Sequence, residues 1–152
     1  MERFMLEALK QAEIALKNDE VPIGCVIVRN RDGKIIAKAY NKRASKKDAT
    51  MHAEIIAIRK ACKVMGDWRL NDCTLYVTLE PCPMCAGAIL NARIGKVVYG
   101  AVDEKSGFFG GVEDISQRNI LNHSVEVVGG FMQNECSYIL NKFFKSKRKN
   151  QN

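Results

Sequence analysis

The order in which strand-like and helical patterns follow one another constrains the fold more than any other feature of this sequence. Two β-rich runs, residues 24–30 and 34–40, are joined by Arg31-Asp32-Gly33, a hairpin turn signal. The other strand-like runs are 74–79, 96–102 and 124–128, and the helical patterns are 1–18, 53–65, 85–93 and 134–147. A short helix or turn is expected before the last strand. A hairpin followed by alternating helices and strands predicts an α/β fold, a three-layer α/β/α arrangement around a mixed five-stranded sheet.

The chain length and the absence of linker-like stretches predict one domain over residues 1–152. No apolar run approaches the roughly 18 residues that a membrane span needs, so we expect no membrane partner. The first residues, MERFMLEALKQAE, are amphipathic and carry acids, unlike a secretory signal or a transit peptide. A cytoplasmic location is therefore the expectation.

The six cysteines fall into two groups. Cys25, Cys62, Cys73 and Cys136 are scattered through apolar stretches, where reduced core thiols are common. Cys82 and Cys85, in the stretch EPCPMC, have the spacing of metal ligands. That spacing alone is ambiguous, because a redox pair uses it too and a structural zinc site usually adds a second pair, which this chain lacks.

The chain has two histidines, which limits the search for further metal ligands. His52 stands at the predicted start of the second helix with Glu54 two residues later, and Cys82 and Pro83 stand at the start of the third. Each of these residues taken alone has an ordinary explanation, such as capping or solvation. Their joint occurrence at two helix starts favours a metal site in which His52, Cys82 and Cys85 are ligands. His123, in the polar stretch ILNHSVEV, is interpreted as structural or close to RNA, not as a ligand.

Three protein ligands leave a fourth position open for water, which is the pattern of a catalytic zinc site. Zinc lowers the pKa of a bound water to about 7. In addition, a helix N-terminus lowers the pKa of a nearby cysteine thiol and so favours the thiolate, the form that binds a metal. Glu54 would then be a carboxylate beside the reactive water, placed to shuttle protons.

The stretches His52-Ala53-Glu54 and Pro81–Cys85 together match the signature of the zinc-dependent nucleobase deaminases. The flanking stretches EVPIG, TLYVTLEPC, CAGAI, ARIGKVVYGA and NKFFK resemble those of bacterial tRNA-specific adenosine deaminases. The resemblance covers nearly the whole chain. It implies a cytidine-deaminase-like fold, one Zn²⁺ per chain on His52, Cys82 and Cys85, and Glu54 as general acid and base. It also implies a homodimer whose substrate is the wobble adenosine of a tRNA, an arginine tRNA by resemblance, which becomes inosine.

The resemblance further implies which residues contact the substrate: Asn41, the backbone N–H of Ala53, Asp103, Lys105 and Phe144. Two stretches depart from the family pattern. The proline that commonly precedes the HxE motif is replaced by Ala49, which affects no ligand. Phe108 and Phe109 replace small residues in the loop DEKSGFFGG, where they could either stack on splayed bases or pack the loop down.

Three other functions are alternatives to a tRNA deaminase. A deaminase of free bases or nucleosides, of the guanine or cytosine type, would use the same site but needs no extended positive surface. The net charge of +7 and the basic C-terminal stretch KSKRKNQN favour a nucleic-acid substrate, although such a tail can also be merely solvated. A non-catalytic RNA-binding module would need a fourth zinc ligand, which the sequence does not offer, and it leaves Glu54 unexplained. A redox protein built on Cys82 and Cys85 ranks lower still.

Overall fold

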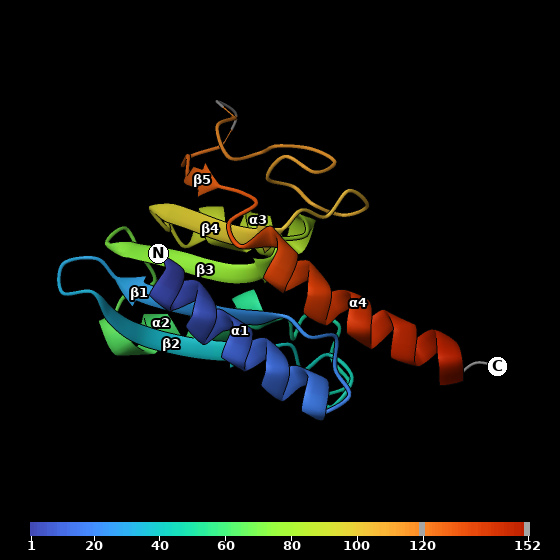
Figure 1. The fold of residues 1–152 in the computed structure, drawn as a ribbon. Helices are drawn as coiled ribbons and strands as arrows, with labels where there is room; N and C mark the ends of the chain where they lie inside the picture. Colours follow the sequence, from blue (N-terminus) through green and yellow to red (C-terminus); the bar gives the residue numbers. More distant parts are fainter. Residues whose placement is uncertain (119–120, 151–152) are drawn as a thin grey trace.

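The computed structural model describes residues 1–118 and 121–150, and its elements follow the predicted order (Figure 1). The helices are α1 (Glu2–Lys17), α2 (Ala53–Met65), α3 (Pro83–Asn91) and α4 (Gln133–Asn150). The strands are β1 (Gly24–Arg29), β2 (Lys34–Tyr40), β3 (Cys73–Leu79), β4 (Lys96–Ala101) and β5 (Glu126–Val128). The last two residues of the basic C-terminal stretch lie outside the described residues.

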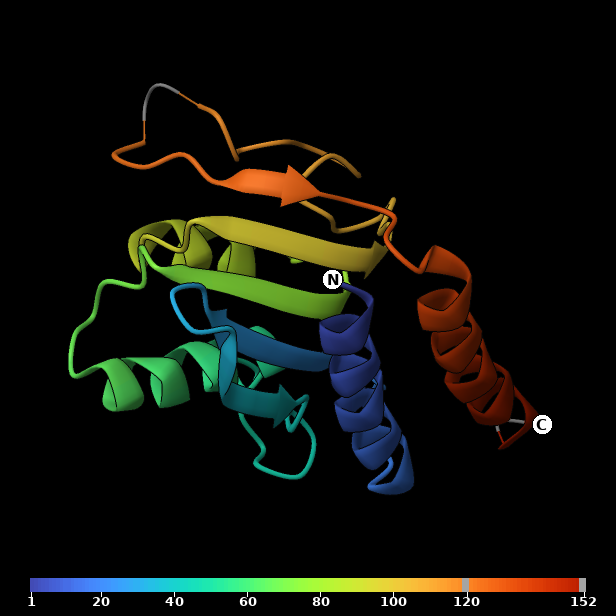
Figure 2. The ribbon, with the colours of Figure 1, turned by 60° about the vertical axis from the view of Figure 1, so that its left-hand side comes forward.

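The five strands form one mixed sheet in the order β2-β1-β3-β4-β5. Strand β1 pairs antiparallel with both β2 and β3, whereas β3, β4 and β5 run parallel. Figure 2 shows β2 and β5 at the two edges of this sheet. The predicted mixed five-stranded sheet is confirmed.

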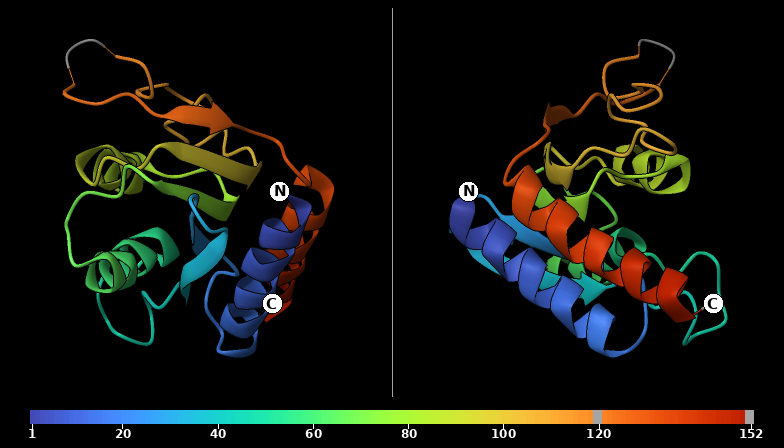
Figure 3. Two further views of the ribbon diagram at one scale, coloured as in Figure 1. Left: turned by 90° about the vertical axis from the view of Figure 1, so that its left-hand side faces the viewer. Right: turned by 45° about the vertical axis from the view of Figure 1, so that its right-hand side comes forward.

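Helices cover both faces of the sheet. Figure 3 shows α1 and α4 on one face and α2 and α3 on the other. The residues of β1 are accordingly buried on both sides: Cys25 and Ile27 belong to the apolar cluster under α2 and α3, and Val26 and Val28 to the cluster under α1. This alternation is what the period of two in a strand produces when both faces are covered. The predicted three-layer α/β/α arrangement is therefore confirmed.

The bounds of several elements differ from the prediction by one to three residues. Helix α3 begins at Pro83, as the proline at the predicted helix start indicates, two residues before the helical pattern of residues 85–93. Between β4 and β5 the described residues form turns and one isolated bridge, Phe109 with Asp114, which agrees with the short helix or turn expected there. The last strand is shorter than predicted and begins at Glu126.

The cysteines and the histidine that were not predicted as metal ligands occupy positions in the core or in loop contacts. Cys25, Cys73 and Cys136 are buried free thiols. His123 Nε2 lies 2.8 Å from the carbonyl oxygen of Ile94, which ties the segment before β5 to the loop before β4. Within the described part of the chain, every helix is too short or too polar to cross a membrane.

Candidate active site

The predicted metal ligands lie at the starts of two helices on the same face of the sheet. His52 is the N-cap of α2 and Cys82 the N-cap of α3, and both have extended backbone, with φ/ψ of −75°/152° and −73°/175°. Cys85 follows in the first turn of α3. First-turn N–H groups have no intrahelical acceptor and give each helix start a partial positive charge. The two helix starts therefore favour thiolate and other anionic ligands.

The side chains of His52, Cys82 and Cys85 lie close enough together to bind one metal ion. His52 Nδ1 lies 3.6 Å from Cys82 Sγ and 3.5 Å from Cys85 Sγ, and the three atoms all lie within 4.8 Å of one another. Zn–S bonds of about 2.3 Å and a Zn–N bond of about 2.0 Å place tetrahedral nitrogen and sulfur ligands about 3.5 Å apart. The group can therefore hold a metal ion, and its spacing fits tetrahedral zinc.

The two thiols differ strongly in acidity. Hydrogen bonds from Cys85 and His52 lower the pKa of Cys82 to about 4, so Cys82 is a thiolate at neutral pH. The hydrogen bond to that thiolate, together with burial, raises the pKa of Cys85 far above its usual range. The hydrogen bond with Cys82 also raises the pKa of His52. The Cys82 thiolate thus supplies one negative charge where a cation would bind.

Glu54 lies in the first turn of α2, and its side chain is 4% exposed. Burial, and to a lesser degree the Cys82 thiolate, raise the pKa of Glu54 to about 7. Within the described residues its Oε1 atom has no hydrogen-bond partner. Glu54 is therefore a carboxyl group that can hold or release a proton near neutral pH, with one oxygen free to contact a ligand.

Asn41 has the second buried side-chain oxygen without a partner in the described residues. It follows β2 and is 3% exposed, and its Oδ1 atom is unpaired. The next residue, Lys42, donates its backbone N–H to the Met51 carbonyl oxygen at 2.9 Å, which connects this segment to the residue before His52. Buried polar atoms are almost always paired, so two orphaned oxygens mark a place prepared for a ligand. Ala53 is buried at the first position of α2, where its N–H has no intrahelical acceptor.

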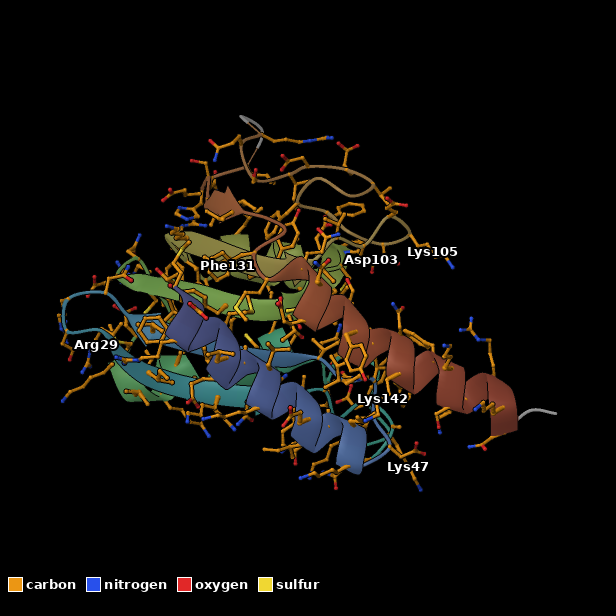
Figure 4. The ribbon with its side chains drawn as sticks, in the orientation of Figure 1. Arg29, Lys47, Asp103, Lys105, Phe131 and Lys142 are labelled. Carbon is orange, nitrogen blue, oxygen red and sulfur yellow. The ribbon has the colours of Figure 1, made fainter. Side chains whose placement is uncertain are left out.

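The other three predicted substrate contacts lie together in a groove. Asp103, Lys105 and Phe144 line a groove of about 700 Å³ between the loop after β4 and helix α4. Arg148 and Lys147 also line it, and Lys147 is ion-paired with Asp19 at 2.6 Å. Figure 4 shows Asp103 and Lys105 on this loop beside α4. Asp103 Oδ1 accepts N–H groups from Lys105 and Ser106, at 3.0 and 3.1 Å, so this side chain also shapes the loop itself. Phe144 is 46% exposed and accessible to a partner.

The two phenylalanines that depart from the family pattern pack the loop down. Phe109 is buried in the cluster under α2 and α3, and Phe108 packs against the same cluster. The Tyr99 hydroxyl donates to the Phe109 carbonyl oxygen at 3.3 Å. Packing, not stacking on bases, therefore accounts for Phe109.

Sequence reasoning gave no role to Glu80, which the structure buries directly before the segment of Cys82. Its carboxylate accepts backbone N–H groups from the loop after β4. An acid at the end of an otherwise apolar strand was the available signal, but its partners lie more than twenty residues further along the chain.

Comparisons with known proteins agree with this geometry. The model of the MafB19-like deaminase family matches residues 1–148. The tRNA-specific adenosine deaminase of Bacillus subtilis (strain 168) is 49% identical over 148 residues, covering 97% of this chain and 91% of that protein. The tRNA-specific adenosine deaminase of Rickettsia bellii (strain RML369-C) is 43% identical over 144 residues, covering 95% and 99%.

Solved structures show the same relationship. A structure from a study of A-to-I editing by tRNA:A34 deaminases at the wobble position has a TM-score of 0.85 and 45% identity, covering 92% of this chain and all of that one. The guanine deaminase of Bacillus subtilis has a TM-score of 0.62 and 47% identity, but covers 66% of this chain and 64% of that one. The similarity to the tRNA deaminases therefore extends over more of both chains, and the chain belongs to the MafB19-like deaminase family.

Proposed function

We propose that this chain is a zinc-dependent tRNA adenosine deaminase that converts the wobble adenosine of a tRNA anticodon to inosine. The observation that carries the proposal is the buried Glu54 carboxyl, with one unpaired oxygen, next to a three-residue metal group in a deaminase fold. The near full-length similarity to tRNA-specific adenosine deaminases supports the choice of substrate.

His52, Cys82 and Cys85 would hold one Zn²⁺ per chain. The donor set and the 3.5 and 3.6 Å separations support this assignment. When bound, zinc acts as a Lewis acid that makes water a nucleophile at neutral pH. Within the described residues the group has three protein ligands and no fourth. A catalytic zinc site needs this arrangement, because its fourth position is kept for water or substrate.

Glu54 would move the protons of the reaction. Its pKa of about 7 suits a group that must both accept and donate a proton at neutral pH. It takes a proton from the attacking water and gives it to ring nitrogen N1 of the adenine. The water oxygen is added at C6, and Glu54 then transfers the second proton to the exocyclic nitrogen, which leaves as ammonia. The unpaired Asn41 Oδ1 and the Ala53 N–H would bind the target nucleoside and orient it.

The groove of Asp103, Lys105 and Phe144 would bind nucleotides that flank the target. Lys105 and Arg148 would supply charge for phosphates, and Lys147 would do so by exchanging its ion pair with Asp19 for a phosphate. The exposed Phe144 ring offers a surface on which a base can stack. A free base is too small to use such a groove. This favours an RNA substrate over a free base or nucleoside.

The proposal includes three wider statements. Residues 1–152 form one catalytic domain, supported by the single sheet with a core on each face. Two copies form a homodimer, which the resemblance implies and a solution mass measurement checks. The protein works in the cytoplasm, where a tRNA-modifying enzyme meets its substrate.

The deciding experiment is to incubate the zinc-loaded protein with bulk tRNA and, in parallel, with free guanine, cytidine and adenosine. We expect inosine at the wobble position of an arginine tRNA and no turnover of the free compounds. Turnover of guanine or cytidine without inosine in tRNA would replace the proposal with a free-base deaminase.

A further inference from the structure

Glu80 is a buried carboxylate that is surrounded by backbone N–H groups. It follows β3 directly, and it is 2% exposed. Its Oε1 atom accepts the N–H of Asp103 at 3.0 Å, and its Oε2 atom accepts those of Phe109 at 3.0 Å and Gly111 at 2.8 Å. All three donors belong to the loop of residues 103–111, which follows β4.

The loop approaches this carboxylate so closely at Gly107 and Gly111 that neither position has space for a side chain. A Cβ atom added at Gly107 would lie 2.2 to 2.5 Å from the carboxyl carbon and both oxygens of Glu80. A Cβ atom at Gly111 would lie 2.7 Å from Glu80 Oε1 and 2.2 Å from the Asp103 carbonyl oxygen. The φ angle of neither glycine lies in the left-handed region, so close approach and not backbone conformation explains these two glycines.

The charge of Glu80 is compensated by these N–H groups. None of the salt bridges formed within residues 1–118 and 121–150 includes Glu80. Burying a carboxylate without a partner is very costly, whereas hydrogen bonds from backbone N–H groups to a carboxylate are charge-assisted and strong. The loop and the carboxylate therefore stabilise one another, and the loop provides an anion site that the protein itself fills.

The same loop is connected to the metal group and to the groove. Phe108 donates its N–H to the Pro81 carbonyl oxygen at 3.0 Å, next to Cys82. At its other end the loop carries Asp103 and Lys105, which line the groove. The Glu80 carboxylate thus lies where the segment of the metal ligands meets the wall of the groove.

We propose that Glu80 is a positioning residue that holds the 103–111 loop, and through it Asp103 and Lys105, in the conformation that binds RNA beside the metal group. This inference rests on the proposed function, because it assigns the groove to the substrate. Glu80 itself does not contact substrate, since its oxygens are occupied by the loop and its side chain is buried.

The first test is Glu80→Gln, assayed on an anticodon stem-loop RNA. The amide keeps the volume but replaces one acceptor oxygen with a donor that faces an N–H group, which releases part of the loop. We expect KM for the stem-loop to rise about tenfold, as for the loss of one charge-assisted hydrogen bond, with kcat within about twofold. Zinc content stays at one per chain. Glu126→Gln, which removes the same charge from an exposed position on β5, is the control and leaves KM unchanged.

Three outcomes of this test would overturn the inference. An unchanged KM would show that the loop does not depend on the carboxylate. A lower kcat at constant KM would place Glu80 in the chemistry, and loss of zinc would place its effect on the metal ligands. If the wild-type protein does not deaminate the stem-loop, the proposed function fails, and the following two tests still decide whether Glu80 holds the loop.

The second test approaches the contact from the loop. Gly107→Ala drives a methyl group into the carboxylate, whereas Glu80→Ala removes the atoms that it would meet. We therefore expect Gly107→Ala to lower Tm in the wild-type background and to have little further effect in the Glu80→Ala background. Additive losses of Tm in the double variant would contradict the proposed contact.

The third test needs no variant. In the wild-type protein the amides of Asp103, Phe109 and Gly111 should exchange with solvent deuterium far more slowly than unprotected amides, because each is bonded to Glu80. Exchange of these three amides at the unprotected rate would overturn the inference even if every variant failed to fold.

Discussion

At the scale of single residues, the candidate site contains hydrogen-bonding capacity that the protein itself does not use. Asn41 Oδ1 and Glu54 Oε1 are buried and unpaired within the described residues. Leaving such an atom unsatisfied costs about 1–3 kcal/mol. These two unpaired atoms lower the stability of the folded protein, but they leave two polar atoms available to contact a substrate.

This cost leads to a prediction for Glu54→Gln. The amide has the same shape and no charge to bury, so we expect Tm to be unchanged or higher and zinc to remain at one per chain. Turnover of a stem-loop RNA should fall by at least about 100-fold, because Gln cannot accept and return a proton. Differential scanning calorimetry, metal analysis and inosine formation measure the three quantities. A variant that turns over at the wild-type rate would remove Glu54 from the mechanism.

The candidate ligands His52, Cys82 and Cys85 could be chosen from the sequence because each belongs to a side-chain motif at a helix start, although the two helix starts lie 30 residues apart. His52 and Cys82 are N-caps, and proline at position 83 identifies one helix start directly. Glu80 could not be assigned a role in the same way. Its partners are backbone N–H groups of Asp103, Phe109 and Gly111, and no sequence pattern records which side chain a loop folds around.

At the scale of elements, a second buried carboxylate, that of Glu20, holds the loop between Asn41 and His52. Glu20 follows α1 and accepts the backbone N–H groups of Ala44 and Ser45 at 3.0 and 2.6 Å. Burial alone would raise the pKa of Glu20, but these backbone hydrogen bonds outweigh burial and lower it. Glu20 therefore holds the loop that leads from Asn41 to His52.

The lowered pKa of Glu20 predicts how stability depends on pH. Because the pKa is lower in the folded state, the stabilisation is fully present above the unfolded-state value of about 4.3 and is lost as pH falls through the folded value. At pH 7, Glu20→Gln should lower Tm by about 2–8 °C. The difference in Tm between wild type and variant should shrink as pH falls below about 4. A difference that is constant from neutral to acidic pH would contradict this role.

Helix α4 supplies a prediction about RNA binding. Phe144 is 46% exposed and packs edge-on against Phe143, with ring centroids 5.5 Å apart. Phe144→Ala should weaken binding of a stem-loop RNA about tenfold, as expected for the loss of one stacked base, with little change in Tm. Tyr138→Ala is the matched control, because Tyr138 is an exposed aromatic residue of α4 that lines a different groove, beside α1. Equal effects of the two variants on RNA affinity would remove Phe144 from the RNA surface.

At the scale of the whole molecule, element order and fold follow from hydrophobic periodicity, whereas the final strand does not. Strand β1 was predicted to within one residue, because a run buried on both faces is continuously apolar. Strand β5 has three residues and is exposed to partly buried, so its pattern is weak. The sequence gives the net positive charge but not where on the surface the basic side chains gather. The structure shows that three of them line one groove.

That groove predicts a salt dependence. If Lys105, Lys147 and Arg148 each neutralise one phosphate, the logarithm of the RNA association constant should fall with the logarithm of salt concentration with a slope of about −2. Fluorescence anisotropy of a labelled stem-loop gives this slope. Lys105→Ala should make it less steep by about 0.7. An affinity independent of salt would contradict an RNA surface at this groove.

The proposed function requires that the site at the starts of α2 and α3 deaminates an adenosine presented by RNA. The most direct measurement is inosine formation in an anticodon stem-loop that carries adenosine at the wobble position, with the same loop carrying adenosine at another position as the comparison. We expect the zinc-loaded protein to convert the wobble adenosine alone, and Glu54→Gln to bind the same RNA with one zinc per chain and to convert none. Conversion by Glu54→Gln at the wild-type rate, or no conversion by the wild-type protein, would contradict it.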